Sequence, residues 1–120
     1  MKLVGVHHVS LTVADVDAAV AFYVDHLGMT LRDDRPDFGF PGAWLDAGNQ
    51  QVHLIQGDPP ANVGQHFAIH VADVDAAVAE LRAGGVEVTD SMVIADASGR
   101  QAFLSDPAGN GIELQEPAAD

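Results

Sequence analysis

Apolar and polar residues change their spacing along the first third of the chain, and the change predicts a strand followed by a helix. Over residues 6–13 they alternate, which is typical of a strand with one buried face. Over residues 16–27 the apolar residues recur at helical spacing. Asp15 or Asp17 is the expected helix cap, and Gly28 is the expected end of the helix.

Three further strands are expected after this helix, near residues 29–34, 43–47 and 51–56. Together these elements form a first βαβββ module that covers about residues 1–57. The next segment, residues 57–64, contains two glycines and two prolines, a composition that indicates a linker.

The same order of elements is expected a second time from His66 onward. Asp73 or Asp75 caps the second helical stretch, and Gly84-Gly85 ends it. Three strands follow, near residues 86–89, 92–95 or 100–105, and 111–116. This second module covers about residues 65–120.

An internal repeat supports the two-module interpretation. The sequence VADVDAAVA of residues 13–21 recurs letter for letter at residues 71–79, an offset of 58. His8 aligns with His66 at the same offset, and His53 aligns with Glu113 at an offset of 60. The 120 residues have the size of one domain. We therefore predict one α+β domain, residues 1–120, built of two tandem βαβββ modules.

Charge and composition exclude several classes of partner. The chain has 5 Lys and Arg against 18 Asp and Glu, a formal net charge of −13. Such a surface repels nucleic acid and anionic membranes, which need clustered cations. No cysteine is present, so thiolate chemistry and disulfides are excluded. No apolar segment approaches the roughly 20 residues of a membrane span, and we expect a cytoplasmic protein that binds a small molecule.

Four potential metal ligands occupy equivalent positions and equivalent faces of the repeat. Neighbouring residues of a strand point to opposite faces. The apolar residues that flank His8, His53, His66 and Glu113 therefore turn these four side chains away from the helices. Three imidazoles and one carboxylate suit Zn, Ni, Co, Mn or Fe. We predict a divalent metal site formed by these residues.

Substrate-binding residues are expected beside the metal. His70 lies four residues from His66, roughly 13 Å along a strand, so it cannot bind the same ion and is placed as a pocket acid or base. Phe38, Phe40 and Trp44 lie in a Gly- and Pro-rich loop. They either cover the core as a lid or form the wall of a pocket for an apolar or aromatic ligand.

With these residues the sequence resembles the vicinal oxygen chelate superfamily, which groups glyoxalases, bleomycin resistance proteins and extradiol dioxygenases. The similarity covers essentially the whole chain. Its carriers are the segment His8–Val13, the pair Phe22-Tyr23, His66, and the stretch Asp106–Leu114 with its Asp-Pro-x-Gly-Asn-x-x-Glu pattern.

The resemblance implies a fold, a cofactor and an assembly. Two βαβββ modules would curl into a cup-shaped mixed sheet around a metal that chelates adjacent oxygens of the substrate. Chains of this length usually form homodimers in that family. His8 and His53 of one chain would then share an ion with His66 and Glu113 of a second chain.

The resemblance also implies candidate reactions. In lactoylglutathione lyases the equivalents of His8, His66 and Glu113 are ligands, and the carboxylate moves a proton between neighbouring carbons. We expect the same catalytic role for Glu113. This chain departs from the lyases at His53, where they have a Glu.

Other members of the superfamily leave alternatives open. These are a thiol transferase, a dioxygenase, and a resistance protein that sequesters an aromatic natural product with or without a metal.

Overall fold

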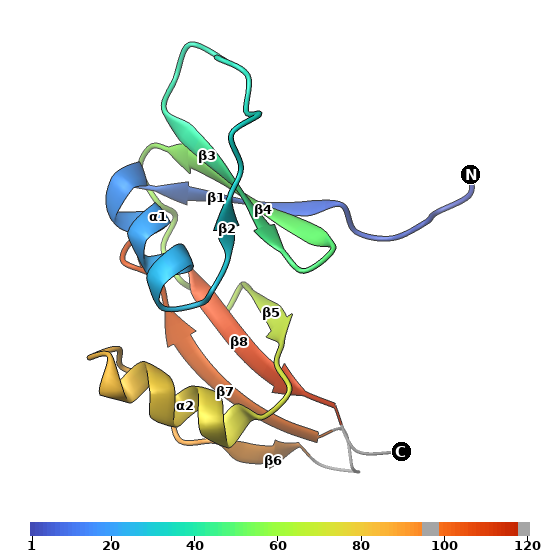
Figure 1. Ribbon diagram of the computed structural model, residues 1–120, viewed down its shortest axis with the longest axis vertical. Helices are drawn as coiled ribbons and strands as arrows, with labels where there is room; N and C mark the ends of the chain where they lie inside the picture. Colours follow the sequence, from blue (N-terminus) through green and yellow to red (C-terminus); the bar gives the residue numbers. More distant parts are fainter. Residues whose placement is uncertain (95–98, 118–120) are drawn as a thin grey trace. The chain divides into compact units, whose positions relative to one another are not determined.

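The computed structural model describes residues 1–94 and 99–117. It divides into two compact units, Met1–Ala61 and Asn62–Asp120. Each unit contains one helix and one four-stranded mixed sheet (Figure 1). The predicted fold, α+β with two copies of a βαβββ unit, is confirmed.

The first unit consists of β1 (His8–Val13), α1 (Val16–Asp25), β2 (Thr30–Leu31), β3 (Gly42–Ala47) and β4 (Gln50–Gln56). Its sheet has the order β1-β4-β3-β2. The first and last strands, β1 and β4, are parallel, whereas the other neighbours are antiparallel.

The second unit repeats this topology with β5 (His66–His70), α2 (Val74–Ala83), β6 (Met92–Ile94), β7 (Gly99–Ser105) and β8 (Gly111–Glu116). Its sheet order is β5-β8-β7-β6, again with the first and last strands parallel. Ser10 of β1 lies opposite His53, and Ala68 of β5 lies opposite Glu113. His53 and Glu113 therefore occupy the same register position, as the repeat predicts.

Both helices begin at a capping aspartate. Asp15 accepts a hydrogen bond from the backbone N–H of Ala18 at 3.1 Å, and Asp73 accepts one from Ala76 at 3.0 Å. Each cap satisfies a backbone donor that the first helical turn leaves without a partner. Of the two candidate caps in each half, the structure selects the first.

Each unit buries its own apolar core between helix and sheet. In the first unit the most buried large side chains are Val13, Tyr23, Leu45, Val52 and Leu54, and in the second they are Val74, Ile112 and Leu114. The alternation of β4 and β8 thus puts the residues on either side of His53 and Glu113 into the core. No helix of the described residues is long and apolar enough to cross a membrane.

The prediction of a strand at residues 86–89 is wrong. The N–H of Thr89 donates to the carbonyl of Phe103 at 2.9 Å, but the N–H of Phe103 donates to the hydroxyl of Thr89 rather than to a backbone carbonyl. The side chain replaces the backbone acceptor, so no strand is formed. The two alternative stretches, 92–95 and 100–105, both contain a strand, β6 and β7. Residues 95 and 118–120 of the predicted ranges lie outside the described residues.

Candidate functional site

In the first unit the two predicted ligands His8 and His53 lie against each other. Their imidazole rings stack with centroids 3.8 Å apart and an angle of 15° between the planes. Both side chains are on the sheet face opposite the core, because Val52 and Leu54 on either side of His53 are buried. The first module thus brings two imidazoles together on neighbouring strands.

Two neighbours fix the orientation of the His53 ring. Trp44 pairs with His53 across β3 and β4, and the two rings stack with centroids 4.6 Å apart. On the other side, Nε2 of His53 lies 2.8 Å from Oε1 of Gln51. An amide oxygen only accepts hydrogen bonds, so Nε2 is the donor.

The surroundings of His53 favour its neutral form. Burial lowers the pKa of His53 below the ordinary 6.5, and the positive charges of His8, His7, Arg32 and Arg35 lower it further. A neutral imidazole is the form that binds metals.

In the second unit His66 contacts Glu113 directly. Nε2 of His66 lies 3.2 Å from Oε1 of Glu113, and Nδ1 lies 2.9 Å from the carbonyl oxygen of Gly64. The carbonyl only accepts, so Nδ1 carries a proton and Nε2 points at the carboxylate. The Gly64 carbonyl raises the pKa of His66 above 6.5, and the Glu113 carboxylate raises it further.

A glycine at the start of β8 makes room for this pair. Gly111 lies opposite His66 in the parallel ladder. A Cβ on Gly111 would lie 3.1 Å from Cβ of His66 and 3.1 Å from the carbonyl oxygen of Gln65. The absence of a side chain at Gly111 lets the two strands approach beside the His66 imidazole.

The loop before β8 is held by a buried carboxylate. Asp106 is 4% exposed, and its Oδ1 accepts hydrogen bonds from the backbone N–H groups of Ala108 and Asn110, both at 2.9 Å. Its Oδ2 accepts a further bond from the Asn110 amide at 3.0 Å. Gly109 adopts a left-handed φ of +91° in this turn. The Asp-Pro-x-Gly-Asn pattern is therefore a turn that sets the start of the strand carrying Glu113.

The four predicted metal ligands lie in two pairs, one pair in each unit, and the orientation of His66 suits a metal ligand. The Nδ1–H of His66 bonds a backbone carbonyl while its Nε2 faces a carboxylate, which is how metal-binding histidines are commonly oriented. Over residues 1–94 and 99–117 no group of three or more His, Asp or Glu side chains is placed to hold an ion. A site formed by all four residues stays a prediction.

Two aromatic residues of the loop before β3 gather with Trp44, which lies in β3, beside His53. Phe38 and Phe40 stack with centroids 5.9 Å apart, and Phe38 lies 6.1 Å from Trp44. All three line a cavity of about 160 Å³ together with His53. Of the two roles left open for these residues, this placement favours the pocket wall.

Arg35 also lines this cavity, and sequence reasoning did not select it. Its guanidinium carbon lies 5.0 Å from the Phe38 ring centroid and 5.3 Å from that of Phe40. The available signal was an arginine three and five residues before two aromatics, in a chain that has only five Lys and Arg.

Within the second unit, His70 lies at the opposite end of β5 from His66. It is exposed at the end of β5 and pairs with Gln115. A cavity of about 390 Å³ contains His66 and Phe103 in its lining, but not His70. The role proposed for His70 in the pocket therefore stays a prediction.

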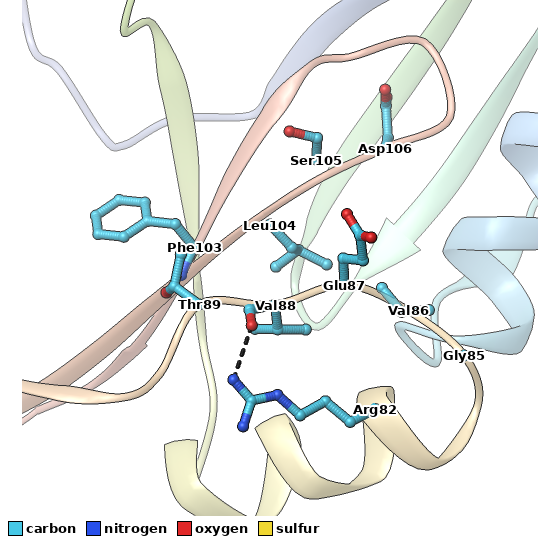
Figure 2. Close-up of a pocket in the computed structure, with 10 residues that line it drawn as sticks. All are labelled: Arg82, Gly85, Val86, Glu87, Val88, Thr89, Phe103, Leu104, Ser105 and Asp106. Carbon is cyan, nitrogen blue, oxygen red and sulfur yellow. Dashed lines mark hydrogen bonds between the residues drawn. The ribbon is translucent and has the colours of Figure 1, made fainter.

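A further hollow in the second unit lies beside the end of α2 and contains neither His66 nor Glu113 (Figure 2). It measures about 910 Å³ and shares Thr89 and Phe103 with the cavity that contains His66. Its one cation, Arg82, donates to the carbonyl oxygen of Val88 at 2.9 Å, as Figure 2 shows.

Known proteins are similar to this chain in sequence and in fold. The model of the Glyoxalase/Bleomycin resistance protein/Dioxygenase superfamily matches residues 5–114. The chain is similar to a 2-epi-5-epi-valiolone epimerase of Actinomyces sp., with 33% identity over 92% of this chain and 78% of the relative.

Two solved structures extend the similarity. A glyoxalase family protein from Bacillus anthracis superposes with a TM-score of 0.85 and 27% identity, over 98% of each chain. TnmS3, an antibiotic binding protein from Streptomyces sp. CB03234, has a TM-score of 0.76 and 30% identity, over 98% of this chain and 99% of that one.

Proposed function

Because this chain belongs to the Glyoxalase/Bleomycin resistance protein/Dioxygenase superfamily, we propose that it is a metal-dependent, glyoxalase-like enzyme. Its substrate is a small molecule with two adjacent oxygens, and its reaction is a proton transfer or a related lyase or isomerase step. The divalent ion is Zn, Ni, Co, Mn or Fe.

The observation that carries this proposal is the oriented His66–Glu113 pair. The Nδ1–H of His66 donates to a backbone carbonyl and its Nε2 faces a carboxylate, which makes Nε2 the ring nitrogen directed toward a shared ion. Glu113 has a side chain that is only 13% exposed, so its carboxylate is partly withdrawn from water. This arrangement supports a role in which Nε2 and the carboxylate act on the same ion.

Glu113 is the proposed general base. A bound divalent ion supplies Lewis acidity, which stabilises negative charge that develops on the substrate oxygens. Glu113 then takes a proton from the carbon next to these oxygens and returns it to a neighbouring carbon. His66 keeps its position during this step, because the Gly64 carbonyl holds its Nδ1–H.

The ligand set is completed by a second copy of the chain in this proposal. Each unit contributes one pair of donors, and two donors are fewer than the three or four protein ligands of a typical site. His8 and His53 of one chain would join His66 and Glu113 of another. Sedimentation should then give a dimer at micromolar concentration, and a monomer that holds its metal at full occupancy would contradict the shared site.

A second candidate function is binding without catalysis. The stacked Phe38 and Phe40 are 50% and 45% exposed, which is unusual for large apolar side chains that are also ordered in a stack. Similarity to an antibiotic binding protein adds weight to a role in sequestering an aromatic natural product.

The test combines metal content with turnover. His66→Ala should lose most of the ion after loading with Mn, Ni or Zn, whereas His26→Ala, an exposed histidine at the end of α1, should keep it. Glu113→Gln should keep much of the metal and lose about a hundredfold or more in rate. Turnover is tested with small molecules that have two adjacent oxygens.

Two outcomes would contradict the proposal. If His66→Ala and His26→Ala both keep stoichiometric metal, the site assignment is wrong. If Glu113→Gln turns over at the parent rate, Glu113 is not the base. Bound metal without turnover, together with tight binding of an aromatic compound, would favour the binding function.

A further inference from the structure

Arg35 differs from the other arginines of this strongly acidic chain. The remaining three each lie within 3.2 Å of a carboxylate oxygen, in the pairs Arg32–Asp34, Arg32–Asp46, Arg82–Asp90 and Arg100–Asp75. Among the described residues Arg35 has no carboxylate within ion-pair distance. The net charge of −13 makes this noteworthy, because carboxylates outnumber cations more than threefold. The positive charge of Arg35 is therefore available to a ligand.

The position of Arg35 is built by its neighbours. A Cβ on Gly42 would lie 2.5 Å from the carbonyl oxygen of Leu54, and 2.6 Å from Nη2 and 2.9 Å from Cζ of Arg35, so the guanidinium lies directly against the backbone of this glycine. Nη2 donates to the carbonyl oxygen of Phe40 at 3.2 Å. The stacked rings of Phe38 and Phe40 both lie within cation–π distance.

Most hydrogen-bonding capacity of the guanidinium is still unused. The group has five N–H donors in a planar fork, and the Phe40 carbonyl is the only acceptor within hydrogen-bond distance among the described residues. A planar fork of this kind suits a carboxylate, which can accept two parallel bonds.

The cavity beside Arg35 has the size and the walls for one aromatic ring. Its volume of about 160 Å³ is well below the roughly 300–1,000 Å³ of sites for drug-sized ligands. Flat side chains, Phe38, Phe40 and Trp44, form much of its lining, and His53 is part of the same lining. A ring in this cavity would lie within reach of both the Arg35 cation and the proposed ligand His53.

We propose that Arg35 makes this cavity selective for aromatic carboxylates with a single ring. The ring stacks on the aromatic wall while the carboxylate accepts hydrogen bonds from the guanidinium. The inference rests on the proposed function, since it names the substrate class for the site that contains His53. Arg35 is thus a specificity-determining residue rather than a catalytic one.

Binding of salicylate and salicylamide to the metal-free protein tests this selectivity. The two probes have nearly the same planar shape and differ in the charge of one group near neutral pH. Calorimetry should show that the parent protein prefers salicylate by about tenfold, the size expected for hydrogen bonds to a charged group. Arg35→Gln should abolish the preference, Arg35→Lys should retain part of it, and Arg82→Gln should not change it.

Three results would overturn the inference. These are equal binding of the two probes by the parent, an unchanged preference in a folded Arg35→Gln variant, and no saturable binding of either probe at millimolar concentration. Dissociation of a dimer by Arg35→Gln, with the preference unchanged, would instead assign Arg35 to a contact between copies. Because the protein is metal-free, failure here is distinguishable from failure of the metal site, which His66→Ala tests.

Discussion

The two units have the same topology and register, but they surround their donor pairs with opposite charges. The pKa of His53 is lowered by burial first, and then by the neighbouring His8, His7 and two arginines. His66 lies between a carbonyl and a carboxylate, and its pKa is raised. The repeated scaffold therefore decides where a pair of donors lies, whereas the surroundings of His53 and His66 shift their pKa values in opposite directions.

The units also differ at the position beside the first histidine. Gln51 lies opposite His8, and its amide bonds the His53 ring. Gly111 lies opposite His66 and provides space instead of a hydrogen bond. The first unit holds its donor pair through the Gln51 side chain, and the second holds its pair through the close approach of β5 and β8.

The largest effect is expected from a substitution in the loop before β8. This loop contains the buried carboxylate of Asp106, which has no buried counterpart in the first unit. Asp106→Ala removes the hydrogen bonds that Oδ1 and Oδ2 accept and leaves the partly buried N–H groups of Ala108 and Asn110 without this acceptor. We expect a loss of about 3 kcal/mol in the free energy of unfolding, measured by denaturant titration. Asp25→Ala, at an exposed position of α1, is the control and should change the stability little. An Asp106→Ala variant as stable as the parent would contradict the structural role of this turn.

The electrostatic contrast predicts that the two histidines titrate on opposite sides of pH 6.5. NMR titration of the metal-free protein should place the pKa of His66 above 6.5 and that of His53 below it. Because the pKa of His66 is raised in the folded state, its contribution to stability is present below pH 6.5 and is lost as the pH rises through the raised pKa. Glu113→Gln should lower the pKa of His66 and leave that of His53 unchanged. Identical titration of the two histidines would remove the contrast between the units.

The smallest effect is expected at Gly111, where the absence of a side chain leaves room for His66. In Gly111→Ala the new methyl group must displace His66 by a few tenths of an ångström. We expect metal affinity to fall roughly tenfold or less, since support of a ligand rather than the ligand itself is changed. Gly5→Ala, where a Cβ meets nothing within 4 Å, is the matched control. Equal metal affinity in the two variants would show that Gly111 does not position His66.

Much of the fold follows from local patterns in the sequence. The repeat of residues 13–21 at 71–79 and the alternation around His53 and Glu113 were sufficient for two βαβββ units and for the face on which these side chains lie. Side-chain direction along a strand depends only on the parity of the position, so no knowledge of distant contacts was needed.

The strand predicted at 86–89 shows where local patterns are insufficient. Its composition resembles that of a strand, but formation of a strand requires a continuous ladder with a neighbour. At Thr89 the hydroxyl takes the place of a backbone acceptor. Competition between a side chain and the backbone for the same donor is decided only when the segment of residues 86–89 and β7 are both in place.

The sequence by itself was enough to identify His8, His53, His66 and Glu113 as candidates, because register and face follow from the order of residues. It could not predict the hydrogen bond between the Gly64 carbonyl and His66, or the approach of the Arg35 guanidinium to Gly42. Nor could it predict the hydrogen bonds of the Asp106 carboxylate within its own turn. These contacts depend on the paths of loops, which carry no periodic pattern. Only the tertiary structure decided them, and with them the charge and the shape around each donor.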